Sequence, residues 1–186
     1  MKRITDLVLA LALLSLLAFP MLLTALLVKL SSKGPALYWS NRVGRNNVIF
    51  RMPKFRSMRL DSPEVATHLL AEPGAYLTPI GPFLRRTSLD ELPQVFSILK
   101  GDLSLVGPRP ALHNQHDLIA LRTERGIHEL VPGLTGWAQI HGRDRLSIRD
   151  KVEFDYQYLR QRTSWLDLKI LLATVGNVLR RDDVAH

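Results

Sequence analysis

The chain contains no cysteine among its 186 residues. That absence excludes disulfides, thiol nucleophiles and metal sites built on cysteine. Common catalytic signatures are absent as well, because the sequence has no Walker A phosphate loop, no G-x-G-x-x-G and no G-x-S-x-G. Kinases, dehydrogenases and hydrolases with a serine elbow therefore lose their usual sequence support.

Acidic side chains are also scarce, with 17 Asp and Glu against 25 Lys and Arg, which leaves a net charge of +8. This excess indicates an anionic partner, and nucleic acid, lipid headgroups and a phosphorylated small molecule all satisfy it. The length leaves room for one modest domain. The position of the charges along the chain has to separate these alternatives.

Residues 7–28 form an uncharged run of 22 residues in which Ser15 and Thr24 are the only polar side chains. Such a run exceeds the length that a bilayer crossing requires. It is also too long for a signal peptide, and no clear small-residue cleavage site follows it. We therefore expect a membrane-inserted helical segment over 1–33 and a cytosolic domain over 34–186.

Pro20 interrupts this run and divides it into pieces of 13 and 8 residues. As helices these pieces are about 20 Å and about 12 Å long, and each is shorter than the hydrocarbon core. Lys2 and Arg3 precede the run, while Lys29 and Lys33 follow it, so the positive-inside rule marks both ends as cytoplasmic. These features favour a Pro-kinked, re-entrant helix, with a kinked helix that spans the bilayer as the alternative.

Residues 36–58 predict two short strands around a turn at 44–47, ending in a basic stretch. Lys54 and Arg56 in this stretch can bind either anionic headgroups or the phosphate of a substrate that arrives in the membrane. The predicted fold class is α+β and mostly helical. A membrane-inserted helix is followed by a small domain that contains a short β-hairpin and amphipathic interfacial helices.

Two adjacent arginines, Arg85 and Arg86, precede two adjacent carboxylates, Asp90 and Glu91. Guanidiniums offer forked donors to phosphate oxygens, and a nearby carboxylate can hold Mg²⁺ or attack phosphorus. A structural alternative exists, because Ser88 with Glu91 three residues later also forms a capping box at the start of a helix. The local pattern alone favours capping over catalysis.

The stretch 101–110 predicts a short strand that runs into a turn, where Arg109 stands between two prolines. A stiff backbone lowers the entropy cost of aiming a guanidinium at a phosphate, although an ordinary turn with a solvated arginine has the same pattern. His113 and His116 lie at i, i+3 spacing on a predicted helix over 111–125. Because no third ligand is obvious nearby, we assign no zinc site.

Three glycines and a proline punctuate residues 131–143, and Trp137, Gln139 and Arg143 project from a predicted loop, strand and loop. Close backbone approach beside an aromatic face suits a nucleotide or sugar ligand. A tight turn around a core tryptophan explains the pattern equally well.

Two helices are predicted at the C-terminal end of the chain. Ser147 and Asp150 open one that runs to about 161, and Ser164 with Asp167 opens another that runs to about 181. Core packing is the default for the apolar stripe of the last helix. A position in the membrane interface is the alternative, indicated by Trp165, Lys169, Arg180 and Arg181.

Together these motifs resemble the bacterial sugar transferases, the monotopic phosphoglycosyl transferases that begin lipid-linked glycan assembly. The resemblance covers nearly the whole chain, and several long motifs occur in the family's order. The matching residues are Lys2, Arg3 and Asp6, followed by 54–58, 87–94, 101–110 and 132–140.

The resemblance implies transfer of a sugar 1-phosphate from a UDP-sugar to undecaprenyl phosphate, with release of UMP and a requirement for Mg²⁺. The place implied is the cytoplasmic face of the bacterial inner membrane, at the start of exopolysaccharide, capsule, O-antigen or glycoprotein glycan synthesis. Asp90 matches the nucleophile, which forms a covalent phosphosugar-enzyme and lies at the metal, with Glu91 as its partner. Arg85 or Arg86 and Arg109 match the family's phosphate-binding arginines.

Elementary electrostatics agrees with that assignment, since a carboxylate at a helix N-terminus near arginines is expected to stay ionised and nucleophilic. Two positions depart from the family pattern. The membrane helix breaks at Phe19-Pro20 where the family has Ser-Pro, and 141–144 reads His-Gly-Arg-Asp where the family usually has Asn-Gly-Arg-Asn.

A competing class is a non-enzymatic, membrane-anchored basic module that recruits anionic partners. It explains the net charge and the apolar run. It does not explain the carboxylates beside the arginines, because these acids would repel a polyanion such as nucleic acid. We therefore expect lipids and phosphorylated substrates as partners, and no nucleic acid.

Overall fold

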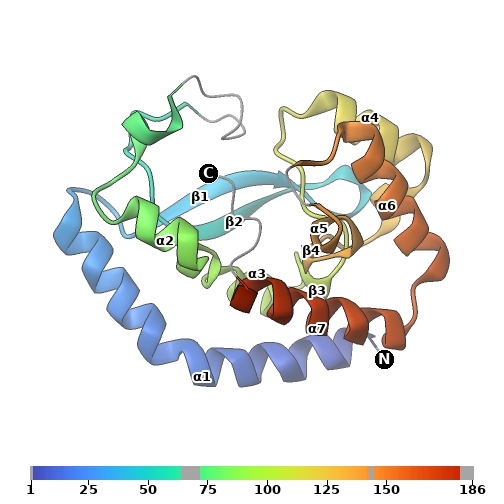
Figure 1. The fold of residues 1–186 in the computed structure, drawn as a ribbon, viewed down its shortest axis with the longest axis horizontal. Coiled ribbons are helices and arrows are strands. Elements are labelled where there is room, and N and C mark those ends of the chain that lie inside the picture. Colours follow the sequence, from blue (N-terminus) through green and yellow to red (C-terminus); the bar gives the residue numbers. More distant parts are fainter. Residues whose placement is uncertain (1, 64–71, 143–144, 181–186) are drawn as a thin grey trace.

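The computed structural model describes residues 2–63, 72–142 and 145–180. A long helix, α1 (Lys2–Ser31), runs beneath a small domain whose centre holds the hairpin of β1 (Leu37–Val43) and β2 (Ile49–Phe55), with the 3₁₀ turn η1 (Arg45–Asn47) between them (Figure 1). The later elements are η3 (Pro73–Tyr76), α2 (Gly81–Thr87), η4 (Leu89–Glu91), α3 (Gln94–Lys100), β3 (Ser104–Val106), α4 (His116–Glu124), η5 (Ile127–Glu129), β4 (Gly133–Thr135), α5 (Trp137–Ile140), α6 (Ile148–Gln161) and α7 (Ser164–Arg180). The predicted α+β, mostly helical class is confirmed.

Helix α1 is 30 residues long and contains Pro20, and Figure 1 shows that it bends part-way along. Proline removes a backbone donor and its ring crowds the preceding turn, which accounts for a bend. Within the described residues, α1 is the one helix long and apolar enough to cross a membrane, yet only 17% of its most apolar stretch is buried in the protein. Its apolar side chains are therefore left without a protein partner over most of their length.

Both ends of α1 are attached to the same domain. Near its start, Arg3 donates to two carbonyls at the end of α3, at 2.5 and 2.7 Å, and the buried carboxylate of Asp6 accepts from the hydroxyl and an amide of β3, at 2.9 and 3.1 Å. At its end, the guanidinium of Arg56 donates to the carbonyls of Ser32 and Lys33, at 2.9 and 2.5 Å. The bend and these two attachments keep both ends of the helix against one body.

The predicted hairpin is confirmed, with β1 and β2 paired antiparallel from Leu37 opposite Phe55 to Val43 opposite Ile49. Alternation along β2 places Phe50, Met52 and Lys54 on one face of the strand. The two apolar members of this set are buried in the main core. The core thereby holds the strand that presents Lys54.

Strands β3 and β4 pair in parallel, which brings the motifs at 101–110 and 132–140 together at these strands. The two backbones touch directly at glycines. A Cβ on Gly133 would lie 2.0 Å from the amide nitrogen of Gly107, and one on Gly136 would lie 2.1 Å from the Gly107 carbonyl oxygen. Close strand packing therefore explains these glycines without a ligand.

The helix predicted over 111–125 begins later, as α4, because the preceding residues extend the hairpin. The amide of Val43 donates to the carbonyl of Ala111 at 2.9 Å. His113 thus lies ahead of the helix while His116 begins it, so the two imidazoles do not share a helical face. In the part of the chain that the structure describes, no group of three His, Asp or Glu side chains is arranged to hold a metal.

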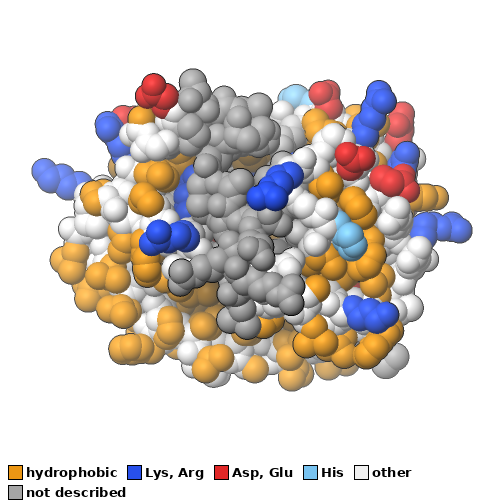
Figure 2. Space-filling model, in the orientation of Figure 1, with side chains coloured by type: hydrophobic (Ala, Val, Ile, Leu, Met, Phe, Trp, Pro, Cys, Tyr) orange, Lys and Arg blue, Asp and Glu red, His pale blue; other side chains and the backbone are white. Residues whose placement is uncertain are grey.

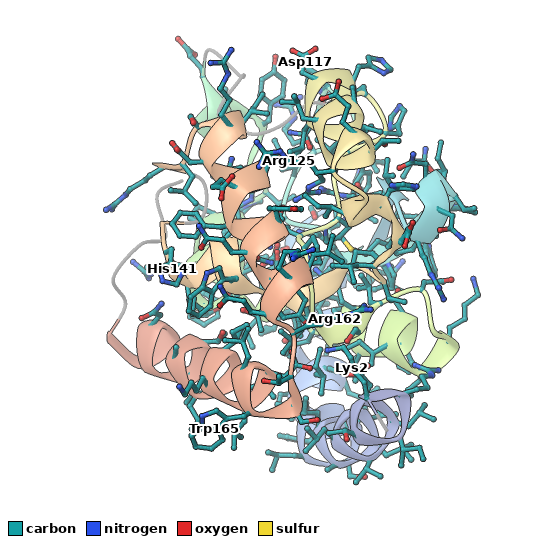
Figure 3. The ribbon with its side chains drawn as sticks, turned by 90° about the vertical axis from the view of Figure 1, so that its right-hand side faces the viewer. Lys2, Asp117, Arg125, His141, Arg162 and Trp165 are labelled. Carbon is teal, nitrogen blue, oxygen red and sulfur yellow. The ribbon has the colours of Figure 1, made fainter. Side chains whose placement is uncertain are left out.

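The two C-terminal helices are confirmed as α6 and α7, and Ser147 caps α6 by accepting from the amide of Asp150 at 3.1 Å. The apolar stripe predicted as core on α7 is mostly exposed. Its exposed members are Trp165, Leu168, Leu172 and Val175. Figure 3 shows Trp165 pointing away from the domain on the side where α1 lies, so α1 and α7 share an apolar underside.

We expect Gly133→Ala to destabilise the protein by about 2 kcal/mol or more, because the added methyl would overlap backbone atoms that have no flexible side chain to move. Thermal unfolding in detergent measures the effect. Gly176→Ala is the matched control, because Gly176 lies inside α7 and a Cβ added there would meet nothing within 4 Å. That substitution should stabilise the protein by up to about 1 kcal/mol. Equal melting temperatures for wild type and Gly133→Ala would contradict the close backbone contact.

Candidate active site

The turn that carries Asp90 and Glu91 begins at Ser88, which ends α2 in the left-handed region with φ 56°. The capping box predicted from Ser88 and Glu91 is wrong, because Ser88 makes no side-chain cap bond and the Glu91 carboxylate pairs with Lys54 instead. Asp90 and Glu91 lie in the 3₁₀ turn η4, which leads directly into α3. Pro93 occupies the N-cap of α3, a position where its missing N–H leaves no bond unmade.

Glu91 joins three segments that are distant in the sequence. Its Oε1 accepts from Lys54 Nζ of β2 at 2.9 Å and from Arg109 Nη2, in the turn after β3, at 3.1 Å. The Lys54 and Glu91 side chains are each 16% exposed and Arg109 is 31% exposed, so the network is largely withdrawn from water. The structure therefore brings together Lys54, Glu91 and Arg109.

Asp90 is buried beside this network. Arg85 of α2 is close enough to act on it electrostatically, and its Nε donates to Ser57 Oγ at 3.2 Å, which holds the guanidinium in place. The next residue, Arg86, lies on the exposed side of α2. Of the two arginines that the sequence offered, Arg85 is the one placed at the carboxylates.

Burial raises the pKa of Asp90 above the ordinary value for a carboxyl group. Lys54, Arg85 and Arg109 oppose the shift, whereas Glu91 adds to it. Desolvation therefore outweighs the nearby cations at Asp90, and the sequence alone does not reveal how far the carboxylate is removed from water. Burial likewise lowers the pKa of Lys54, against the attraction of Glu91.

Two further arginines, which the sequence interpretation missed, surround the turn that carries Arg109. Arg42 of β1 donates from Nη1 to the carbonyl of Pro110 at 3.2 Å. Arg122 of α4 donates to the carbonyl of Arg109 at 2.8 Å and pairs with Asp155 of α6, which is 1% exposed. A signal for each was present: Arg42 alternates onto one face of a strand, and Asp155 interrupts the buried stripe of an amphipathic helix.

Three predicted site residues have other surroundings. Arg56 is buried, and its two terminal nitrogens donate to carbonyls just after the end of α1. Trp137 donates to Gln157 of α6 at 3.3 Å and packs against His141, with ring centroids 4.2 Å apart. The amide atoms of Gln139 are buried on the same short helix, and that helix packs on α6 and α7. Arg143 lies outside the described residues.

The distribution of side chains agrees with this organisation. Figure 2 shows hydrophobic side chains along the lower edge, over α1, while the acidic side chains visible on this face lie in its upper part. A bent apolar helix thus underlies a basic site that contains a buried carboxylate. Such an arrangement is typical of membrane-associated proteins that bind anionic ligands.

A family model described as bacterial sugar transferase matches residues 1–181, and the chain belongs to this family. It is 40% identical over 182 residues to the UDP-glucose:undecaprenyl-phosphate glucose-1-phosphate transferase of Escherichia coli (strain K12), covering 94% of this chain and 39% of that protein. It is 38% identical to the UDP-N-acetylgalactosamine-undecaprenyl-phosphate N-acetylgalactosaminephosphotransferase of Aeromonas hydrophila, over 96% of this chain and 43% of that protein. The chain therefore spans less than half the length of these two relatives.

A shorter relative matches over most of its own length. The chain is 42% identical over 181 residues to the uncharacterized sugar transferase EpsL of Bacillus subtilis (strain 168), covering 96% of this chain and 87% of that protein. The chain therefore corresponds to most of the length of this relative.

We expect Asp90→Asn to raise the melting temperature near neutral pH. A carboxyl whose pKa is raised by folding stabilises the protein below its ordinary pKa, and this contribution is lost as pH rises through the folded-state pKa. Removing the charge restores it. The gain should vanish in acid, where the wild-type carboxyl is protonated in both states.

Asp117→Asn is the control, because Asp117 is exposed at the start of α4, where Figure 3 shows it at the outer end of the domain. This variant should give no such gain. An Asp90→Asn protein that melts at or below the wild-type temperature at neutral pH would contradict the destabilising burial of the charge.

Proposed function

We propose that the chain is a phosphoglycosyl transferase that moves a sugar 1-phosphate from a UDP-sugar to undecaprenyl phosphate and releases UMP. The observation that carries this proposal is the buried carboxylate of Asp90, placed beside Glu91 and among Lys54, Arg85 and Arg109. The printed names of the Escherichia coli and Aeromonas hydrophila relatives support the same reaction class.

In the first half-reaction, an oxygen of the Asp90 carboxylate attacks the phosphorus that bears the sugar. A bond forms between that oxygen and phosphorus, and the bond from phosphorus to the oxygen shared with the other phosphate breaks, so UMP leaves with the bonding electrons. The product is an aspartyl-phosphosugar on the enzyme. Lys54, Arg85 and Arg109 supply the cations that offset the charge on the diphosphate and on the leaving phosphate.

Burial of Asp90 contributes to this step. A carboxylate with little hydration has less solvent to shed before it attacks, and the fixed cations replace that solvent without reorganising. The same exclusion of water protects an acyl phosphate from hydrolysis while it waits for the acceptor. The raised pKa of Asp90 reflects the energetic cost of the arrangement in the resting enzyme.

In the second half-reaction, a phosphate oxygen of undecaprenyl phosphate attacks the same phosphorus. The bond between phosphorus and Asp90 breaks, which regenerates the carboxylate and leaves undecaprenyl diphosphate sugar. A soluble donor and a membrane-embedded acceptor can therefore use one small site in turn.

The carboxylate pair also fits a magnesium ion. Mg²⁺ is usually held by one or two carboxylates together with substrate phosphates, and Asp90 with Glu91 offers such a pair at the site. When bound, the ion supplies charge neutralisation on the diphosphate and stabilises the leaving nucleotide. We assign its protein ligands to Asp90 and Glu91.

The position of α1 supports a protein that enters the membrane from one side. Because both ends of α1 are attached to one domain and the helix bends at Pro20, the apolar middle is placed to dip into the bilayer and return. The exposed apolar face of α7 then lies in the interface, with Lys169 held over the Trp165 ring at 5.4 Å. We propose that the domain lies at the cytoplasmic face of the inner membrane.

We expect Asp90→Asn to abolish release of UMP from UDP-sugars, because an amide is a poor nucleophile toward phosphorus. The assay uses membranes that contain the protein, a panel of UDP-sugars, Mg²⁺ and undecaprenyl phosphate. A radiolabelled donor sugar should remain on wild-type protein when the acceptor is omitted, and it should not remain on the variant.

Asp102→Asn is the matched control for that experiment, since Asp102 lies just beyond α3 and pairs with the exposed Lys100 at the end of that helix. It should keep wild-type turnover. Retained turnover in the Asp90→Asn protein would remove Asp90 as the nucleophile.

The re-entrant topology has a direct test, which the lack of cysteine makes clean. A single cysteine introduced by Lys33→Cys and, in a separate protein, one in a short tag ahead of Met1 should both resist a membrane-impermeant thiol reagent applied to intact cells. Both should react after the cells are opened. Labelling of the N-terminal tag in intact cells would establish a spanning helix instead.

A further inference from the structure

The turn Pro108-Arg109-Pro110 is held by hydrogen bonds to three successive carbonyls. The carbonyl of Pro108 accepts from the amide of Gly133 at 2.9 Å. The next two carbonyls accept from Arg122 at 2.8 Å and from Arg42 at 3.2 Å. Because proline has no N–H, two of the three residues offer no amide donor, and carbonyl acceptors are the main way to fix this backbone.

Arg122 is itself held in a fixed position. Its Nε and Nη2 donate to one oxygen of Asp155, at 3.0 and 2.6 Å, while Nη1 is left for the carbonyl of Arg109. The side chains of Arg122 and Asp155 are 11% and 1% exposed, so this ion pair is shielded from solvent. A planar guanidinium clamped at two nitrogens presents its third in one direction.

Arg42 reaches the turn from strand β1 of the hairpin. Its Nε donates to the buried hydroxyl of Ser40 at 3.0 Å, two residues back on the same face of β1. It is also close enough to Lys54 to contribute to the lowering of that residue's pKa. Two guanidiniums, one from β1 and one from α4, therefore donate hydrogen bonds to adjacent carbonyls of the same turn.

Side-chain packing does not fix the turn from every side. A small cavity of about 30 Å³ borders Pro108 and Pro110 and extends between the hairpin tip and η5. Space of this size leaves the two proline rings without full contact on that side. The polar bonds to the carbonyls then decide where the backbone lies.

We propose that Arg42 and Arg122 are positioning residues for the transfer reaction: by holding the carbonyls of Pro110 and Arg109, they aim the Arg109 guanidinium at the donor diphosphate beside Glu91. This proposal rests on the proposed function. Arg109 contacts substrate, whereas Arg42 and Arg122 act through the backbone that carries it.

The test is a single-turnover measurement of UMP release from the UDP-sugar donor by detergent-solubilised full chain, without acceptor. Its amplitude counts folded active sites, and its rate constant reports the chemistry in each site. Arg122→Lys and Arg42→Lys keep the charge but cannot reproduce the forked contacts. We expect each to lower the rate constant by about tenfold to a hundredfold, with most of the amplitude kept, because small misplacements near the reacting groups have effects of this order.

Matched controls come from the same elements. Arg125→Lys alters an exposed ion pair with Glu153 that also links α4 to α6, and Arg51→Lys alters an arginine that lies over Trp39 on the outer face of the hairpin. Both should keep the wild-type rate constant. These controls separate loss of the carbonyl contact from a general weakening of the helices or the hairpin.

A double-mutant cycle with Arg109→Met decides whether the two arginines act through Arg109. Adding Arg122→Lys to Arg109→Met should then have no further effect on the rate constant. Fully additive effects, or single variants that lose amplitude at an unchanged rate constant, would overturn the positioning role. Wild-type protein that releases no UMP from any UDP-sugar would overturn the proposed function itself, which is a different result.

Discussion

The rest of the site depends on one shared acceptor: Oε1 of Glu91 accepts hydrogen bonds from both Lys54 and Arg109. Lys54 comes from the hairpin, Arg109 from the turn after β3, and Glu91 from the turn before α3. Without this meeting, three cationic side chains would repel one another around a buried Asp90. Ion pairs that are withdrawn from water stabilise a fold only when their geometry is good. Here the charges balance only after the hairpin and both turns have reached their places.

The same balance explains why a site of such small size can hold a carboxylate with an elevated pKa. Desolvation disfavours the charge on Asp90. The surrounding cations offset part of this cost, and unlike water they are already fixed in place. The site therefore holds a charge whose loss of hydration is only partly offset by its neighbours. Sites that act on charged substrates commonly carry such strain, because the substrate completes the electrostatic arrangement.

Patterns in the sequence predicted the long apolar helix, the hairpin and the two C-terminal helices, and they singled out Lys54, Arg85 or Arg86, Asp90, Glu91 and Arg109 as site residues. These features depend on local composition and on long motifs. What the sequence could not reveal depends on distant contacts. Burial raises the pKa of Asp90, and Arg56 donates to a carbonyl just after α1. The contacts of Arg42 and Arg122 with carbonyls form only when the hairpin and α4 pack against the turn.

The backbone contact between Gly107 and Gly133 has a consequence for how this protein tolerates sequence change. Where side chains separate two packed elements, substitutions that alter their volume shift the backbones a little. Here no side chain stands between the strands. The register of the two strands ahead of the turn that carries Arg109 is therefore set by backbone atoms at these glycines. A single methyl group added at this contact would have to displace the backbone itself.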